Sequence, residues 1–364
     1  MSSDPGLVVA ILTKDRPGSF TRTLHGLKGV RQPVSALIVV DSSIRKESID
    51  INRRAIGSSC IGSKYYVPLC RVAELPGAET IFSYLRRDLQ TFNARHWNTP
   101  LAREMAFCIA ATISTAANYL FIDDDVLLEG GIDLPSSNST ISPFEISGTP
   151  DYCRLGWANK WMKSNYDRSN YSQDIPTESD LPIRSVVRQR LSYGSGMAFV
   201  TNVCPREFIP LPDCYGEDVF LLSKHVSRNS WQAAGEVIHA PPHKHIMHPG
   251  AILREMIGQS SVNALLFMQG SPVSLGYTVK QAWLLGLSDI DESIRLAQCL
   301  IDRPGFDGAA LHKLHALLNS IKTNYKEIGF ESMKRILCDF MRRCNSRSKI
   351  RPELIACAVG DLRF

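Results

Sequence analysis

Short apolar runs alternate with helical patterns of apolar residues over the first 125 residues of the chain. Four runs predict strands: Leu7–Leu12, Ala36–Val40, Tyr65–Cys70 and Tyr119–Ile122. Apolar residues at helical spacing predict three helices: Ser19–Leu27 with Ser19 as its N-cap, Ile81–Phe92 and Leu101–Ala117. Continuous apolar runs are typical of strands buried on both faces, and their alternation with helices indicates a parallel sheet. The sequence therefore predicts an α/β fold with a mostly parallel central sheet flanked by helices.

The pattern changes twice after this region. Residues 136–192 are rich in Ser, Asn, Asp, Pro and aromatic residues, which predicts an irregular segment that forms an insertion or lid. Trp157 and Trp161 within it could stack on a flat ligand or pin the segment to the core. The later chain is mainly helical, which divides it into regions 1–250 and 251–364. Helices are predicted over Ala251–Met268, Gln281–Asp302, Ala309–Ile321 and Ser332–Arg343.

Composition and charge exclude several classes of protein. The chain has 364 residues, of which 44% are hydrophobic and 21% charged, so it is neither disordered, collagen-like nor a coiled coil. A net charge of +5 is too small to indicate nucleic acid. The ten cysteines form no CxxC pair, and neither a signal peptide nor a membrane span is predicted. We therefore expect a cytoplasmic protein without an integral membrane segment.

Three consecutive carboxylates, Asp123, Asp124 and Asp125, directly follow a predicted buried strand. Such a cluster is costly to bury unless a cation neutralises it. On an extended backbone Asp123 and Asp125 would point the same way and could share a ligand. Oxygen ligands suit Mn²⁺ or Mg²⁺. The run thus favours a divalent metal site over the alternative, a solvated acidic turn.

A second acidic pair, Glu217–Asp218, opens an apolar helix-like run. These carboxylates could interact with a helix dipole, or one of them could act as a general base beside a metal. Arg16 and Arg103 are candidate partners for phosphate, because a guanidinium recognises phosphate oxygens in a bidentate manner. As isolated arginines, both would more often lie on the surface.

Four of the nine histidines fall within ten residues, at His239, His243, His245 and His248. Imidazole is a good metal ligand, so at least one of them is expected to bind a metal. The spacing does not decide which one.

The order of these features resembles the family 2 glycosyltransferases, which have the GT-A fold. The resemblance covers residues 6 to 250 and rests on the succession of these segments: Val9–Gly18, Ile38–Ser43, Leu101–Arg103, Leu120–Asp125, Gly194–Ala198 and Gly216–Asp218, followed by histidine. It implies a non-processive enzyme that transfers a sugar from a nucleoside diphosphate donor, with UDP favoured, to an acceptor hydroxyl. Region 1–250 would then be the catalytic domain, with 136–192 on the acceptor side.

The resemblance also implies roles for individual residues. Asp218 would be the general base beside Glu217, and Arg103 would lie near the donor diphosphate. Asp123 and Asp125 match the DxD motif, and Asp124 lies between them at the donor. His239 and His243 match the position of a further metal ligand, and His245 is also compatible with it. The residues that match the nucleotide-binding positions are Thr13, Asp15, Arg16 and Asp41.

The chain departs from the family pattern in two places. Ser42–Ser43 follows Asp41 without a second acidic residue, and no QxxRW motif follows Asp218, which disfavours a processive membrane-embedded synthase. Three alternatives stay open at this point. They are a nucleotidyltransferase, which the absence of a GGxGTR-like loop disfavours, a metal-dependent hydrolase, and a non-catalytic protein that binds sugar nucleotides.

Partners other than the donor are less defined by the sequence. The acceptor is a small molecule or glycan, and an aromatic acceptor would suit Trp157 and Trp161. The helical C-terminal region could supply a homodimer surface. The basic residues between Lys334 and Arg351, including Arg335 and Arg343, could contact an anionic lipid or acceptor, or form a solvated helix face.

Overall fold

A computed structural model describes most of the two regions predicted from the sequence. The described residues are 6–75, 77–90, 92–93, 99–113, 118–128, 132–134, 141–148, 162, 182–183, 198–225, 233–239, 248–270, 273–301, 307–346, 352–360 and 362–364. Trp157, Trp161, His243 and His245 lie outside them. Within the described residues, no helix combines the length and apolar character needed to cross a bilayer.

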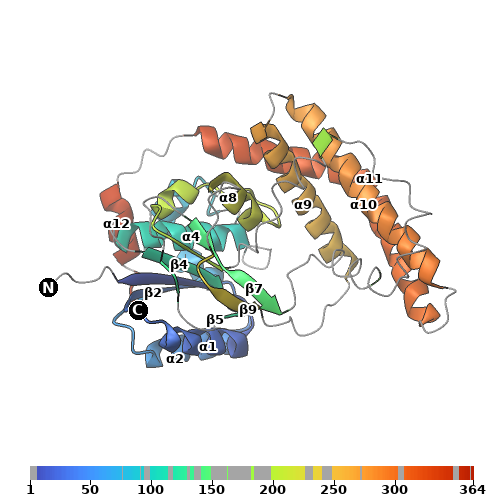
Figure 1. The fold of residues 1–364 in the computed structure, drawn as a ribbon. Helices are drawn as coiled ribbons and strands as arrows, with labels where there is room; N and C mark the ends of the chain where they lie inside the picture. Colours follow the sequence, from blue (N-terminus) through green and yellow to red (C-terminus); the bar gives the residue numbers. More distant parts are fainter. Residues whose placement is uncertain are drawn as a thin grey trace.

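A six-stranded central sheet forms the core of the N-terminal half (Figure 1). Its strand order is β3-β2-β1-β4-β8-β6, with β1 to β4 parallel and β8 antiparallel to its neighbours. The strands are β1 (Leu7–Thr13), β2 (Val34–Asp41), β3 (Ser63–Pro68), β4 (Asn118–Asp123), β6 (Ile141–Pro143) and β8 (Ala198–Thr201). A second sheet has the order β5-β9-β7, made of β5 (Val126–Leu128), β7 (Glu145–Gly148) and β9 (Glu236–His239). The α/β class with a mostly parallel sheet is thus confirmed.

Helices cover both faces of the central sheet (Figure 1). Along β1, Leu7, Val9 and Ile11 point into the core beneath α1 (Pro17–Gly26) and α2 (Lys46–Ser58). Val8 and Ala10 point to the other face, into the core that includes α3 (Ala78–Tyr84) and α4 (Thr99–Ile113). Alternate residues of a strand face opposite sides, so an unbroken apolar run is what a doubly covered strand needs.

The C-terminal helices pack against one another and have their own apolar core. They are α9 (Pro249–Gly270), α10 (Leu275–Ile301) and α11 (Gly308–Asn345), and α8 (Glu217–His225) joins them to the sheet. After α11 the chain returns to the N-terminal half, where α12 (Pro352–Gly360) packs on α3 and α4. The chain then ends beside β3, where the Phe364 amide donates to the Lys64 carbonyl at 2.7 Å.

Several predicted element boundaries are wrong. The first helix begins at Pro17 without a side-chain cap, because proline suits the first helical position; Ser19 lies inside the helix. The third predicted strand ends at Pro68 and continues as a 3₁₀ helix, Leu69–Glu74. The helix predicted over Ile81–Phe92 ends at Tyr84. The described part of the predicted irregular segment contains β6 and β7, which pair with strands that follow later in the chain.

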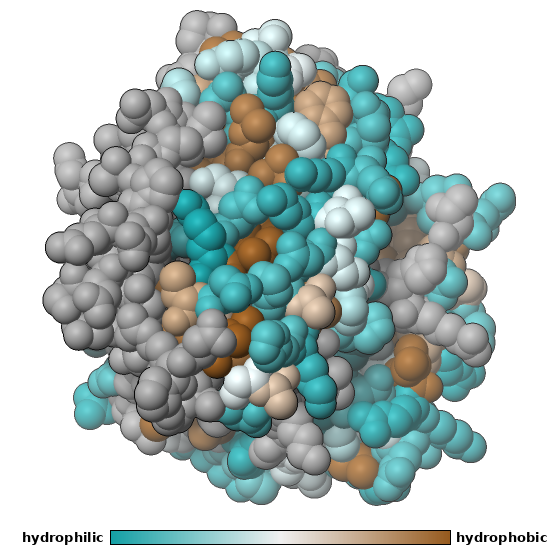
Figure 2. Space-filling view, turned by 90° about the vertical axis from the view of Figure 1, so that its right-hand side faces the viewer, coloured by the Kyte–Doolittle hydropathy of each residue, from teal (hydrophilic) through white to brown (hydrophobic). Residues whose placement is uncertain are grey.

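Figure 2 shows the face that lies to the right in Figure 1, where the C-terminal helices lie. Among its coloured residues hydrophilic side chains predominate, and hydrophobic ones gather only in small groups. The exposed large apolar residues, such as Tyr277 and Ile328, are similarly scattered in sequence. The coloured residues of this view thus form no large apolar patch of the kind that the possible homodimer surface would need.

Candidate functional site

The carboxyl ends of three neighbouring strands bring the predicted polar clusters to one edge of the sheet. In the strand register Thr13 pairs with Asp41, and Leu12 pairs with Asp123. Neighbouring parallel strands run in the same direction, so their carboxyl ends lie at the same edge of the sheet. Ligands of such sheets bind beyond that edge. The convergence that the sequence predicts is therefore present in the structure.

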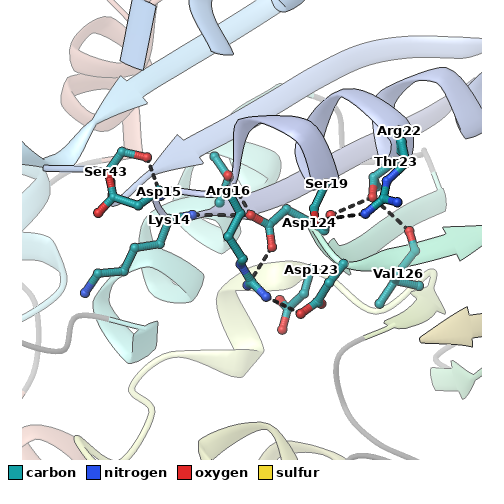
Figure 3. A network of polar contacts seen from close by, with 12 residues as sticks. Lys14, Asp15, Arg16, Ser19, Arg22, Thr23, Ser43, Asp123, Asp124 and Val126 are labelled. Carbon is teal, nitrogen blue, oxygen red and sulfur yellow. Dashed lines mark hydrogen bonds and ion pairs between the residues drawn. The ribbon is translucent and has the colours of Figure 1, made fainter. Parts of the chain in front are cut away.

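The acidic run forms a turn at the end of β4, and Arg16 lies over it (Figure 3). Asp124 is fully buried and accepts a hydrogen bond from the Thr13 hydroxyl at 2.7 Å. The Arg16 guanidinium forms ion pairs with Asp124, at 2.6 Å, and with Asp125. The Thr23 hydroxyl of α1 also holds the turn, because it donates to the Asp124 carbonyl at 2.8 Å.

The turn changes the argument about Asp123 and Asp125. The strand ends at Asp123, so the two side chains are not related by the alternation of an extended backbone. They have different cationic partners, Arg103 for Asp123 and Arg16 for Asp125. A single ligand could still bind both carboxylates, but the local backbone geometry does not by itself make the two side chains point the same way.

Arg103 links three elements beneath the acidic turn. Its side chain is buried on α4, and its Nε donates to Glu217 Oε1 of α8 at 2.9 Å. The Nη2 atom of the same guanidinium donates to Asp123 Oδ2 of β4 at 3.1 Å. The negative charges of Asp123, Glu217 and Asp218 outweigh the burial that lowers the Arg103 pKa, so this pKa is raised. Arg103 is therefore a firmly charged brace between the two acidic motifs.

Among the described residues, negative charge exceeds positive charge at this edge. Burial together with the charges of Asp125 and Asp218 raises the pKa of Asp123 to about 6, although Arg103 and Arg16 act in the opposite direction. Burial, with a contribution from neighbouring carboxylates, likewise raises the pKa of Asp124 to about 7 and that of Glu217 to about 8. Two guanidinium groups thus face a larger set of carboxylates: Asp123, Asp124, Asp125, Glu217 and Asp218.

This charge surplus fits a divalent cation. Asp123 Oδ1 is buried and accepts no hydrogen bond within the described part of the chain, so an oxygen atom is available as a ligand. The described residues alone do not bring three acidic, histidine or cysteine side chains together around one point. The backbone of His239 pairs with Val126, directly after Asp125, which places that residue beside the turn. The donor set and charge therefore suit Mn²⁺ or Mg²⁺, with a further ligand needed besides the aspartates.

Asp41 lies below the surface of this edge and is fully buried. Its carboxylate accepts hydrogen bonds from the Ser43 amide at 2.8 Å, the Asn52 amide group at 2.9 Å and the Tyr66 hydroxyl at 2.8 Å. In this structure Asp41 thus orders the loop after β2. Asn52 and Tyr66 belong to no sequence motif, so the sequence does not reveal them as partners of Asp41.

The loop after β1 places Asp15 at the rim of the site. Asp15 adopts a left-handed backbone conformation with φ of 52°, and its backbone amide donates a hydrogen bond to the Ser43 hydroxyl oxygen at 2.7 Å (Figure 3). Its carboxylate accepts a hydrogen bond from the Arg45 amide at 3.1 Å. Asp15 is less buried than Asp41, so it is the more accessible of the two carboxylates expected to bind a nucleotide.

Asp218 occupies the first turn of α8, next to Glu217. It is partly buried, whereas Glu217 is buried and held by Arg103. Its charge raises the pKa of both Glu217 and Asp123, so it lies within electrostatic reach of the acidic turn. Of the two, Asp218 is better placed to meet a ligand.

Comparisons with known proteins give limited information. No family model and no curated protein matches the chain. Among solved structures, it is similar to the mannosyltransferase PcManGT from Pyrobaculum calidifontis, which was solved in complex with GDP-Man and Mn²⁺. The similarity covers 99% of this chain and 88% of the other, at 12% sequence identity and a TM-score of 0.41. A TM-score of this size carries no argument about fold or activity, so the functional assignment rests on the site.

Proposed function

We propose that this protein is a metal-dependent, non-processive glycosyltransferase. It would transfer a sugar from a nucleoside diphosphate sugar, with UDP as the first candidate, to an acceptor hydroxyl. The observation that carries the proposal is the convergence of the loop after β1, the acidic turn and the Glu217–Asp218 pair at one sheet edge with surplus negative charge. A donor diphosphate would be repelled by this edge alone, but a divalent cation would make it attractive.

The candidate site residues divide into groups with different proposed roles. Asp123 and Asp125 would hold the metal, with His239, His243 or His245 completing the shell, and Asp124 would fix the turn. The bound ion would neutralise the charge that develops on the leaving nucleoside diphosphate. Arg103 would act as a positioning residue, because its guanidinium is already paired with Asp123 and Glu217.

The nucleotide would lie against the loop after β1. Thr13 and Asp15 would position the base and ribose, and Asp41 would support them through Ser43. Arg16 is partly exposed, so it could turn from the acidic turn to the donor phosphates.

Asp218 would act as the general base in the transfer step. Its carboxylate would take the proton of the acceptor hydroxyl while the hydroxyl oxygen attacks the anomeric carbon. The bond from that carbon to the diphosphate oxygen breaks in the same step, and the diphosphate leaves with the electron pair. A single displacement of this kind inverts the anomeric centre.

Calorimetric titration of UDP tests the donor site directly. We expect binding in the presence of Mn²⁺ that is lost on chelation and lost in Asp125→Ala. Asp50→Ala, a surface aspartate on α2, serves as the matched control and should bind normally. GDP is titrated in parallel, and binding of GDP alone would keep the mechanism but change the donor. Binding of neither nucleotide with metal present would overturn the proposal and favour a hydrolase.

Release of nucleoside diphosphate from a panel of sugar nucleotides tests the catalytic step. We expect Asp218→Asn to retain Mn²⁺-dependent nucleotide binding while losing turnover. Turnover at the wild-type rate in this variant would remove Asp218 as the base.

A further inference from the structure

A cavity of about 490 Å³ lies beside the proposed donor site. Its walls come from the loop after β1, from the segment that precedes Gly216 and from helices α9 and α11. Lys14 and Tyr215 line it, and each is next in sequence to a motif of the site: Lys14 precedes Asp15, and Tyr215 precedes Gly216. The cavity therefore opens where a second substrate could approach Asp218.

Three cationic side chains line this cavity: Lys14, Arg254 and Arg335. None of them takes part in an ion pair among the described residues. Asp213 is the single acidic residue in the lining. It forms an ion pair at 3.4 Å with Arg87, which does not line the cavity. The cavity thus combines three cations with one carboxylate that already has a partner.

The backbone amide of Lys14 lies 3.4 Å from Asp124, but its side chain points away from the acidic turn (Figure 3). Burial lowers the Lys14 pKa, and the charge of Arg254 lowers it further against the effect of Asp15. Lys14 and Arg254 are therefore near enough to repel each other. Two like charges held at one cavity favour an anion between them.

Four large apolar side chains also line the cavity, two from α9 and two from α11. Ile328 and Ile336 of α11 are eight residues apart, and Ile336 is next in sequence to Arg335. Leu253 and Ile257 of α9 are four residues apart, and Leu253 is next in sequence to Arg254. Residues at these spacings share a helix face. The cavity therefore offers a cationic part and an apolar part to the same ligand.

We propose that this cavity binds the acceptor through a phosphate monoester that is attached to an apolar group. A phosphate monoester carries close to two negative charges at neutral pH, which suits three cations better than a single carboxylate would. The acceptor hydroxyl would then face Asp218, next to Tyr215 and Gly216. The assignment of this ligand as the acceptor rests on the proposed function, whereas the anion site itself does not.

Binding of phenyl phosphate, measured by calorimetry without metal or nucleotide, tests the site. We expect phenyl phosphate to bind more tightly than inorganic phosphate, and benzyl alcohol not to bind. The double variant Arg254→Gln/Arg335→Gln should weaken phenyl phosphate binding at least tenfold. The matched control Lys280→Gln/Lys334→Gln removes two exposed charges from α10 and α11 outside the cavity, and should bind within twofold of wild type. Equal weakening in both double variants, or no binding to wild type, would overturn the proposal.

Two further arms separate the possible sources of the ligand and the two proposals. Binding of the protein to vesicles that contain phosphatidic acid, compared with vesicles of phosphatidylcholine alone, tests whether the ligand is a lipid. Vesicle binding that the Arg254→Gln/Arg335→Gln variant loses would identify a lipid as the source of the phosphate. Phenyl phosphate that binds alongside UDP and Mn²⁺ supports a separate acceptor site, whereas displacement by UDP would overturn the acceptor assignment. Phenyl phosphate binding without any nucleotide binding would retain the anion site and reject the proposed transferase.

Discussion

The Arg343 guanidinium donates a hydrogen bond to Glu104 Oε1 at 2.6 Å, across 239 residues of sequence. Both side chains are buried, and the same carboxylate oxygen also accepts the Leu211 amide at 2.6 Å. Arg343 lies near the end of α11, and Glu104 is the neighbour of Arg103 on α4. The last turns of the C-terminal helix thus brace the helix that positions Arg103 against Asp123 and Glu217.

Replacing Arg343 should therefore destabilise the whole protein. Arg343→Met leaves the Glu104 carboxylate buried with Arg87 as its remaining charged partner, at 2.6 Å. Loss of one partner of a buried ion pair costs about 3–5 kcal/mol. Urea denaturation should show this loss for Arg343→Met, but a change of under about 1 kcal/mol for Arg342→Met, whose exposed side chain pairs with Asp339. Equal effects of the two variants would contradict the bracing role.

Arg343 also shows what the sequence could not predict. Arg343 belongs to the basic stretch between Lys334 and Arg351. The sequence predicts that this stretch contacts an anionic lipid or acceptor or forms a solvated helix face, but Arg343 is buried. Charge alone does not reveal burial, because the partner, Glu104, is far away in sequence. By contrast, the strands were predictable because apolar runs such as Leu7–Leu12 need cover on both faces, whatever their neighbours are.

The helix α11 illustrates a second limit. The pattern predicts two helices, Ala309–Ile321 and Ser332–Arg343, but one helix runs from Gly308 to Asn345. The intervening residues are mostly polar, since much of this stretch faces solvent and only Tyr325 and Gly329 are buried in it. The acidic site was predictable for the opposite reason, because polar residues that directly follow buried strands converge at the sheet edge.

Tyr66 should contribute to stability through Asp41. Tyr66→Phe removes one of the hydrogen bonds that the buried Asp41 carboxylate accepts, and hydrogen bonds to charged groups contribute about 1.5–3 kcal/mol. Urea denaturation should show a loss of this size, and UDP binding should weaken because the Ser43 loop is less ordered. Tyr65→Phe, in the neighbouring and less buried position, is the control and should change little. A Tyr66→Phe protein as stable as wild type would show that Asp41 does not need this donor.

The stability of the metal-free protein should fall as pH rises. The pKa of Glu217 is about 8 in the folded protein against an ordinary value of 4.5, so the folded state holds this proton more tightly than the unfolded state. Between these values the folded state binds more protons, and stability therefore decreases with pH and levels off above about pH 8. Asp123 and Asp124, with pKa values of about 6 and 7, act in the same direction.

Glu217→Gln isolates this contribution. Unfolding by urea in the presence of chelator, at intervals from pH 5 to pH 9, should show a smaller loss of stability in this variant than in wild type. Glu331→Gln, on the exposed surface of α11, should follow the wild-type curve. A wild-type protein whose stability rises relative to Glu217→Gln over this range would contradict the sign of the shift.

Arg16 should compete with a metal ion for the acidic turn. Its guanidinium pairs with Asp124 and Asp125, so Arg16→Gln should lower the stability of the metal-free protein and increase the affinity for Mn²⁺ several-fold. Thermal unfolding with and without Mn²⁺ measures both effects. Arg22→Gln, at an exposed arginine of α1 six residues further along the chain, should alter neither. Weaker Mn²⁺ binding in Arg16→Gln would mean that Arg16 supports the metal site instead of competing for it.

Gly258 should be essential for the close approach of α9 to the segment before Gly216. A Cβ atom at this position would lie 2.6 Å from the Tyr215 amide nitrogen and 2.8 Å from its carbonyl oxygen, and backbone atoms cannot move aside cheaply. Alanine normally stabilises a helix interior by up to about 1 kcal/mol relative to glycine. Here we expect the opposite, a loss of about 1–3 kcal/mol from overpacking, together with weaker phenyl phosphate binding because Tyr215 lines the cavity. Gly276→Ala in α10, where no atom lies within 4 Å of the added Cβ, should cause no loss in urea denaturation. A Gly258→Ala protein as stable as Gly276→Ala would show that α9 can shift away from Tyr215. The walls of the cavity would then not be fixed relative to each other, which would contradict a preformed binding site.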